Sequence, residues 1–137
     1  MADIVYNNFI DRLGEKVYDM HNDVFKMLLL DDGHTPLATH VDYTDVIADE
    51  LSNGNGYTTG GLTLVHTWTQ AAGVSVFDAD NALWVSANFT ARYAIIYNDT
   101  VGDELVCLID FTENKQASNI TFEVRFDVNG IFDLAQT

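Results

Sequence analysis

Residues 77–98, FDADNALWVSANFTARYAIIYN, contain the feature that most constrains the fold, which is a strand-length segment apolar on both faces. Side chains of a β-strand point alternately to opposite faces of its sheet. Within residues 91–97, Ile95 falls on one face and Ile96 on the other, so both faces need cover. Such a strand lies in the middle of a sheet. The sequence therefore predicts a β-rich domain around a central strand, preceded by another strand over residues 82–89.

The length and composition indicate one folded domain. A chain of 137 residues can bury a core without disulfides or metals. Its 47% of hydrophobic and 12% of aromatic residues argue against disorder. We expect a single domain over residues 1–137, with an N-terminal helix within residues 1–20 and a β-rich core over residues 21–137. No apolar run has the length of a membrane span, and charges interrupt the first twenty residues, so we expect neither a membrane segment nor a secretory signal.

The charge balance is strongly acidic. Six Lys and Arg against 21 Asp and Glu give a formal net charge of -15. This charge repels the phosphates of nucleic acids and of anionic membranes, so we expect neither as a partner. The acidic residues are spread along the chain, which predicts a solvated acidic surface. A partner with basic patches is the functional alternative.

The first segment predicts an amphipathic helix over residues 3–20. Asp3 can cap its first amides, and apolar residues recur at steps of three or four. The stripe consists of Tyr6, Phe9, Leu13, Val17 and Met20. A stripe of this kind packs either on a sheet face of its own domain or on a neighbouring subunit, and the sequence leaves both open.

The remaining segments predict short strands and turns. Strands are expected over residues 24–30, 62–69, 74–77, 82–89, 91–97, 105–111, 120–126 and 131–134, a short helix capped by Thr44 or Asp45 within residues 37–51, and a polar loop over residues 113–119. Residues 52–61, rich in Gly and Asn, predict a flexible surface loop. Asn129 and Gly130 predict a tight hairpin between the last two strands. The fold class is therefore mainly β, an antiparallel β-sandwich or partly closed barrel of about seven or eight strands with one N-terminal amphipathic helix.

Residue types that can carry chemistry occur without the spacing that chemistry needs. Cys107 lies in an apolar run, which predicts a small buried hydrophobe and not a reactive thiol. The acidic turn over residues 78–81 lacks the pattern of an EF-hand, so we expect a solvated turn. No serine stands in a nucleophile elbow. We therefore expect no enzyme activity, no catalytic residue, no metal site and no cofactor.

The histidines and the large aromatic residues each allow two interpretations. The four histidines, His21, His34, His40 and His66, do not stand at the spacing of a zinc-binding HExxH motif. We expect His34 and His40 to be exposed, and His66 to be partly buried and hydrogen-bonded. The strand aromatics Trp68, Trp84, Tyr93 and Tyr97 are either core residues or a sugar-binding face, and core packing is the simpler interpretation.

Three segments resemble a known group of proteins: GYTTGGLTL at 56–64, FDADNALWVSANFTARYAIIYND at 77–99 and TFEVRFDVNGIFDL at 121–134. Together with their order along the chain, they resemble small virion structural proteins of tailed bacteriophages and prophages. The resemblance implies a capsid decoration, or cement, protein made in the host cytoplasm and located in the virion. Its partners would be the major capsid protein and other copies of itself in a homo-oligomer. A tail or neck structural protein and a host-surface glycan-binding module are the alternatives.

For a decoration protein, the contact residues are expected in two places. The first helix offers an apolar stripe, and a flexible loop can mould itself to a partner. The expected contact residues are Tyr6, Phe9, Leu13, Asn53, Asn55, Tyr57, Thr58 and Thr59.

Overall fold

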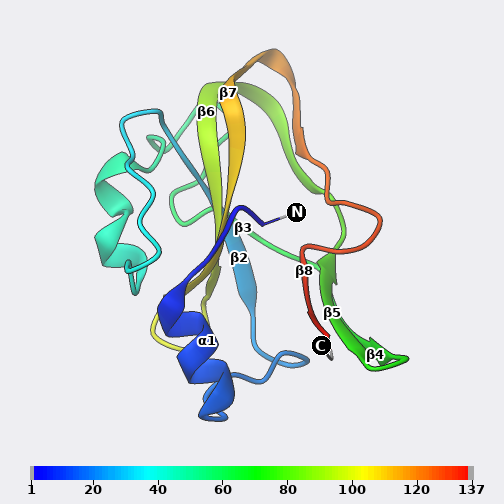
Figure 1. The fold of residues 1–137 in the computed structure, drawn as a ribbon. Helices are drawn as coiled ribbons and strands as arrows, with labels where there is room; N and C mark the ends of the chain where they lie inside the picture. Colours follow the sequence, from blue (N-terminus) through cyan, green and yellow to red (C-terminus); the bar gives the residue numbers. More distant parts are fainter. Residues whose placement is uncertain (1, 136–137) are drawn as a thin grey trace.

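Two antiparallel sheets and one α-helix make up the fold in the computed structural model, which describes residues 2–135 (Figure 1). The larger sheet contains, in spatial order, β1 (Ile4–Val5), β7 (Glu104–Val124), β6 (Ala82–Asn98), β2 (Phe25–Leu30) and β3 (Leu62–Thr63). The smaller sheet contains β4 (His66–Ala71), β5 (Val74–Ala79) and β8 (Phe132–Ala135) in that order. The predicted mainly β class is confirmed.

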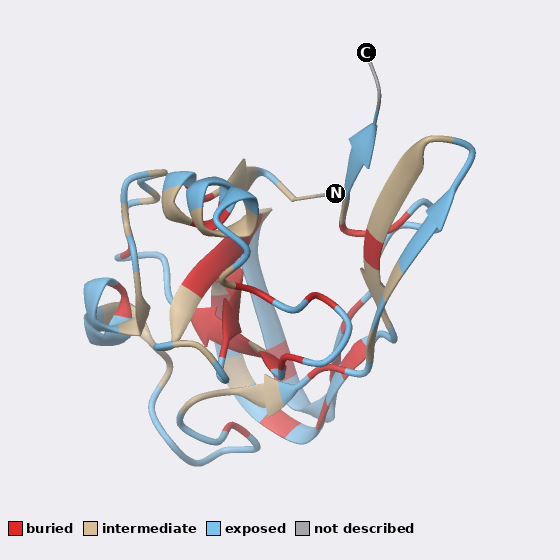
Figure 2. Cartoon of the chain, turned by 90° about the horizontal axis from the view of Figure 1, so that it is seen from below, coloured by how far each residue is buried: buried red, intermediate tan, exposed pale blue. Residues whose placement is uncertain are grey.

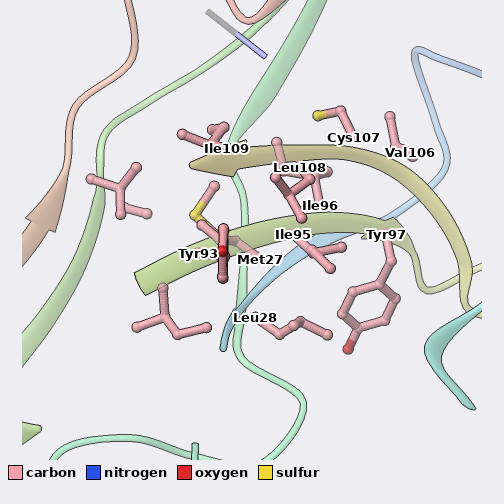
Figure 3. Close-up of a cluster of buried hydrophobic side chains, with 14 of the residues drawn as sticks. Met27, Leu28, Tyr93, Ile95, Ile96, Tyr97, Val106, Cys107, Leu108 and Ile109 are labelled. Atoms are coloured by element: carbon pink, nitrogen blue, oxygen red, sulfur yellow. The ribbon is translucent and has the colours of Figure 1, made fainter. Parts of the chain in front are cut away.

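The central strand of the larger sheet is β6, as its two apolar faces predict. It lies between β2 and β7 and pairs antiparallel with both. Leu28 of β2 faces Ile95 of β6, which faces Leu108 of β7. These three side chains are buried in the cluster shown in Figure 3. Burial of one such aliphatic side chain contributes about 1.5–3 kcal/mol, so this part of the sheet supplies much of the stability.

Strands β6 and β7 are longer than predicted and form one bent ribbon. Residues 113–119, expected to be a loop, belong to β7 and pair with β6, for example Lys115 with Ala91. Their polar composition suits a strand exposed to solvent, which the loop prediction did not consider. Ser86 and Thr112 have positive φ angles of 51° and 67°, and the ladder changes register near Ala91. Such bulges bend a ribbon without ending it.

Helix α1 (Asn7–Gly14) is shorter than the predicted helix over residues 3–20. Asp3 does not cap it, because its carboxylate accepts the Asp110 amide at 2.7 Å and the chain beside it pairs with β7 as β1. Tyr6 occupies the N-cap position without a side-chain cap. After the helix, Lys16 has a φ of 64°, which is incompatible with helix continuation. Within residues 2–135, no helix has the length and apolarity required to cross a membrane.

The segment between β2 and β4 differs from its prediction in two places. Two short 3-10 helices, η1 (Tyr43–Asp45) and η2 (Ile47–Asp49), replace one helix, and Asp42, not Thr44 or Asp45, is the N-cap residue, accepting the Thr44 amide at 2.9 Å. The predicted strand over residues 62–69 divides into β3 and β4. It divides because the Leu64 amide still bonds to Phe25 of the larger sheet, whereas His66 pairs with Ala79 of the smaller one.

The predicted hairpin at Asn129 and Gly130 is wrong. Gly130 closes a turn, since its amide donates to the Asp127 carbonyl at 2.9 Å. The strand that follows, β8, then pairs with β5 and not with β7. The residue types at 129 and 130 correctly predicted a turn. They could not predict that β8 pairs with β5, which lies more than fifty residues earlier in the sequence.

Candidate functional site

The charged residues are unevenly distributed over the fold. None of the six Lys and Arg or 21 Asp and Glu lies within residues 51–77. This segment forms the loop over residues 52–61, strands β3 and β4, and most of β5. Burial does not explain the missing charge, because four of the six residues of β4 are exposed and the other two are half-buried. An exposed, uncharged segment on a protein of net charge -15 is the principal candidate for a contact surface.

The loop over residues 52–61 is anchored by the Glu50 carboxylate. That carboxylate accepts hydrogen bonds from the Tyr43 hydroxyl, from the Tyr57 hydroxyl at 2.5 Å and from the Gly60 amide at 2.8 Å. The Tyr57 hydroxyl also accepts the Leu29 amide of β2 at 3.2 Å. These bonds hold Tyr57 and Gly60 of the loop to Glu50, which directly follows η2, and to β2 of the larger sheet. Residues 52–56, 58 and 59 are exposed, which confirms the prediction of a surface loop.

The tyrosines of this anchor stay protonated. Burial, followed by the hydrogen bond to Glu50, raises the pKa of both Tyr43 and Tyr57 well above the usual tyrosine value. Burial likewise raises the pKa of Tyr97, whose hydroxyl donates to the Gly60 carbonyl at 2.6 Å. The Tyr43 and Tyr97 rings stack with centroids 5.5 Å apart. All three hydroxyls therefore remain donors over the physiological pH range.

The glycines of the GYTTGG motif are required by close packing of the backbone. A Cβ atom on Gly56 would lie 2.8 Å from the Ser86 carbonyl oxygen, and one on Gly61 only 1.8 Å from the Met27 carbonyl oxygen. Both glycines have positive φ angles, 90° and 78°. The motif therefore lets the loop lie directly on β6 and β2.

The loop presents an uncharged polar surface, which we call the loop surface, consisting of the exposed side chains of Asn53, Asn55, Thr58 and Thr59. Asn53 accepts the Thr59 amide at 3.0 Å through its side chain, and the Asn55 carbonyl accepts the Asn88 amide of β6 at 2.8 Å. Of the expected contact residues in the loop, only Tyr57 is withdrawn from the surface, with 2% of it exposed. The other four are exposed, and the bonds of the Asn53 side chain and of the Asn55 and Thr59 backbones hold the loop that carries them.

The expected contact residues on the helix lie differently. Tyr6 and Phe9 are buried, and Leu13 is half-buried against the same core. Phe9 stacks on Tyr18 and meets Phe132 edge-on, both with centroids 5.4 Å apart. Of the two arrangements left open by the sequence, the helix covers its own domain. Its two buried residues offer no surface to a partner.

A partly buried ion pair fixes α1 to the larger sheet. Two guanidinium nitrogens of Arg12 donate to Glu104 at 2.8 and 3.2 Å, and the Tyr18 hydroxyl donates to the same carboxylate at 2.5 Å. The Arg12 hydrogen bond is the main cause that lowers the pKa of Glu104. Sequence analysis missed this pair because 92 positions separate its members.

Most groups that could carry chemistry serve the fold. Cys107 is fully buried, and burial raises its thiol pKa to about 12, as its apolar surroundings predict. His66 is half-buried with its Nε2 atom 3.0 Å from the Met20 carbonyl oxygen, also as predicted. The Asp78 carboxylate accepts the Ala79 amide at 2.8 Å, as expected for a turn that satisfies local amides, whereas the Asn81 side chain accepts the amide of Phe126, 45 positions away, at 3.1 Å.

The prediction that His34 is exposed is wrong. Its ring is buried, with Nδ1 2.9 Å from the Asp49 carboxylate and the ring centroid 5.6 Å from that of His40. The residues between β2 and η1 fold back over the sheet, and weak sequence patterning does not reveal this. His34 Nε2 and His40 Nδ1 have no hydrogen-bond partner among the described residues. Within residues 2–135, no three His, Cys, Asp or Glu side chains are grouped to hold a metal ion.

The strand aromatics belong mainly to the core. Trp84, Tyr93 and Tyr97 are buried, which confirms the core interpretation for these three. Trp68 is half-buried and lines a hollow of about 380 Å³ together with residues 13 and 16–21.

Comparison of the chain with protein families, with curated proteins and with solved structures found no match.

Proposed function

We propose that the protein is a virion structural protein of the capsid decoration type, which binds the outer face of an assembled phage head through its loop surface. The observation that carries the proposal is the anchored, uncharged loop on an acidic protein. Burying uncharged side chains avoids the large desolvation penalty of buried charge. An anchored loop also loses little conformational entropy on binding. The choice of a phage head as the partner rests on the resemblance of the three segments to phage virion proteins.

The net charge of -15 favours a basic partner. Five of the six Lys and Arg, all except Lys16, take part in an ion pair among the described residues. Most of the 21 Asp and Glu therefore have no Lys or Arg partner among the described residues. A basic rim on the capsid would complement this negative charge, steer association and make binding weaker at high salt.

The proposal is tested by adding purified protein to heads that lack it and measuring bound protein by co-sedimentation. Thr58→Lys and Thr58→Glu each place a charge on the loop surface, and we expect either sign to reduce occupancy at least about tenfold, since each must be desolvated on docking. Thr39→Lys and Thr39→Glu are matched controls, because Thr39 is also exposed and lies beside the start of α1. Equal binding by all four variants would argue against the loop surface.

Copy number in purified virions separates the head from the tail. A decoration protein is present in a fixed ratio to the major capsid protein, whereas a tail or neck component forms one or a few rings. Quantitative mass spectrometry of particles measures this ratio. Absence from particles would end the proposal. Deletion of residues 1–20 is a poor test, because it removes Tyr6 and Phe9 from the core.

A further inference from the structure

Strand β4 is an open edge of the smaller sheet. It pairs with β5 along its whole length, from His66 opposite Ala79 to Ala71 opposite Val74. On its other side no strand of residues 2–135 pairs with it. The β4–β5 hairpin projects from the body of the protein at the lower right of Figure 1, and most of it is exposed or intermediate in Figure 2.

The outward hydrogen-bonding groups of β4 can be assigned from the ladder. The Val65 carbonyl accepts the Asp80 amide at 2.9 Å, so Val65 directs its backbone groups toward β5. Residues of an antiparallel pair alternate between bonding to the partner strand and pointing away from it. The amides and carbonyls of His66, Trp68 and Gln70 therefore point to the open side.

This edge lacks the features that usually protect open strands. Edge strands are commonly guarded by charged side chains, prolines or bulges. The sequence of β4, HTWTQA, contains no Lys, Arg, Asp, Glu or Pro, and its register with β5 has no shift. The other long open edge, residues 111–124 of β7, contains Glu113, Lys115 and Glu123 and positive φ angles at Thr112 and Asn119. The β7 edge is therefore protected against pairing with another strand, and the β4 edge is not.

We propose that β4 pairs antiparallel with β4 of a second copy of this chain, which joins the two smaller sheets in the order β8-β5-β4-β4-β5-β8. A two-fold axis at Trp68 places His66 of each copy opposite Gln70 of the other, so every outward backbone group of these residues is paired. In this register, Thr67 of one copy faces Thr69 of the other on the exposed face.

Charge explains why the occupant is a second copy. Two molecules of net charge -15 repel each other over most of their surfaces. Across paired β4 strands, the Asp78 residues of the two copies are three strand spacings apart, roughly 14 Å at about 4.8 Å per spacing. This exceeds the Debye length of about 8 Å at physiological salt. The hollow beside Trp68 contains both Lys16 and Asp19, so it adds no net charge. A basic partner would instead favour an acidic edge.

The pairing is independent of capsid binding, because it uses the β4 edge and is measured on the isolated protein. Analytical ultracentrifugation over a concentration series should show a monomer–dimer equilibrium. Thr69→Lys puts a charge on the exposed face of β4, and we expect it to weaken dimerisation at least about tenfold. Thr121→Lys makes the same change on the charged β7 edge and should leave dimerisation unchanged. A monomer at every concentration, or equal dimerisation of both variants, would overturn the pairing.

Disulfide formation tests the register. Residues facing each other at a non-hydrogen-bonded position lie about 4.5 Å apart at Cα, within disulfide range. A mixture of Thr67→Cys and Thr69→Cys should form a mixed dimer on oxidation, while each variant alone should form far less. The native Cys107 is buried and does not compete. No disulfide in the mixture, or equal yields from each variant alone, would contradict this register.

Discussion

The two sheets of this protein have the same antiparallel pairing but differ in how they are covered. In the larger sheet, β2 is buried except at Lys26, and the second half of β6 is buried on both faces. In the smaller sheet only Phe77 is fully covered, and most of β4 and β8 is exposed. The larger sheet therefore supplies most of the stability, and the smaller sheet supplies accessible surface. In this chain, the accessible surface is also the uncharged one.

The largest effect should come from a glycine at the edge of the larger sheet. Gly61→Ala would place a Cβ atom 1.8 Å from the Met27 carbonyl oxygen at a positive φ, so the backbone of β2 or of the loop must move. We expect a loss of more than about 4 kcal/mol in the free energy of unfolding, measured by urea denaturation.

The matched variant, in the turn that packs against β5 of the smaller sheet, is Gly130→Ala. Its Cβ atom would meet chiefly a methyl carbon of Val76 at 2.4 Å, and a side chain can rotate away. We expect a smaller loss of about 1–3 kcal/mol, from the positive φ and local repacking. Equal losses for the two glycines would contradict the contrast between the sheets.

Truncation of apolar side chains measures the contrast directly. Ile95→Ala removes a fully buried side chain from the middle of the larger sheet, and we expect a loss of about 2–5 kcal/mol in unfolding free energy. Leu134→Ala in β8, where half of the residue is exposed, should change it by less than about 1 kcal/mol. Thermal unfolding followed by circular dichroism gives both values. A large loss for Leu134→Ala would show that the smaller sheet supports the fold as strongly as the larger one.

The anchor of the loop surface should have an intermediate effect. Glu50→Gln replaces the charged acceptor of two tyrosine hydroxyls and one amide, and hydrogen bonds to charged groups contribute about 1.5–3 kcal/mol. We expect a loss within that range and faster hydrogen exchange of the amides of residues 53–60. Glu113→Gln, on the exposed stretch of β7, is the control and should lose less than about 0.5 kcal/mol. Unchanged exchange in the loop would mean that Glu50 does not hold it.

The smallest effect is a dependence on pH at the attachment of α1. Because Arg12 lowers the pKa of Glu104 in the folded state, the pair stabilises the protein above the usual glutamate pKa of about 4.5, and this contribution is lost as the pH falls below that value. Glu104→Gln should therefore be less stable than the unmodified protein at neutral pH, and the difference should shrink in acid. Urea midpoints over a pH series measure it. A difference that stays constant through the acid range would exclude this role for the pair.

The alternation of apolar and polar residues correctly predicted which faces of individual strands are buried. It identified β6 as central and placed Trp84 and Tyr97 in the core, while Gly and Asn content located the loop that carries the four exposed contact candidates. It did not identify neighbours, because a strand pattern specifies faces and not partners. The sequence pattern therefore could not predict that β8 pairs with β5 or that Arg12 contacts Glu104.

Only one of the properties that define the candidate site, the absence of charge, could be predicted from the sequence. The absence of charge over residues 51–77 can be read directly, but its significance depends on exposure. Strand β4 is exposed over most of its length, which alternation between Thr and larger residues does not predict. The anchoring of the loop depends on Glu50 and on the approach of Gly61 to β2, which are tertiary contacts.

Because Cys107 is buried, its reaction with thiol reagents can be used to measure unfolding of the protein. Thiol reagents attack the thiolate, and a thiol that is fully buried with a pKa near 12 reacts only when the strands around it separate. The rate at which a reagent labels Cys107 therefore follows global opening of the larger sheet.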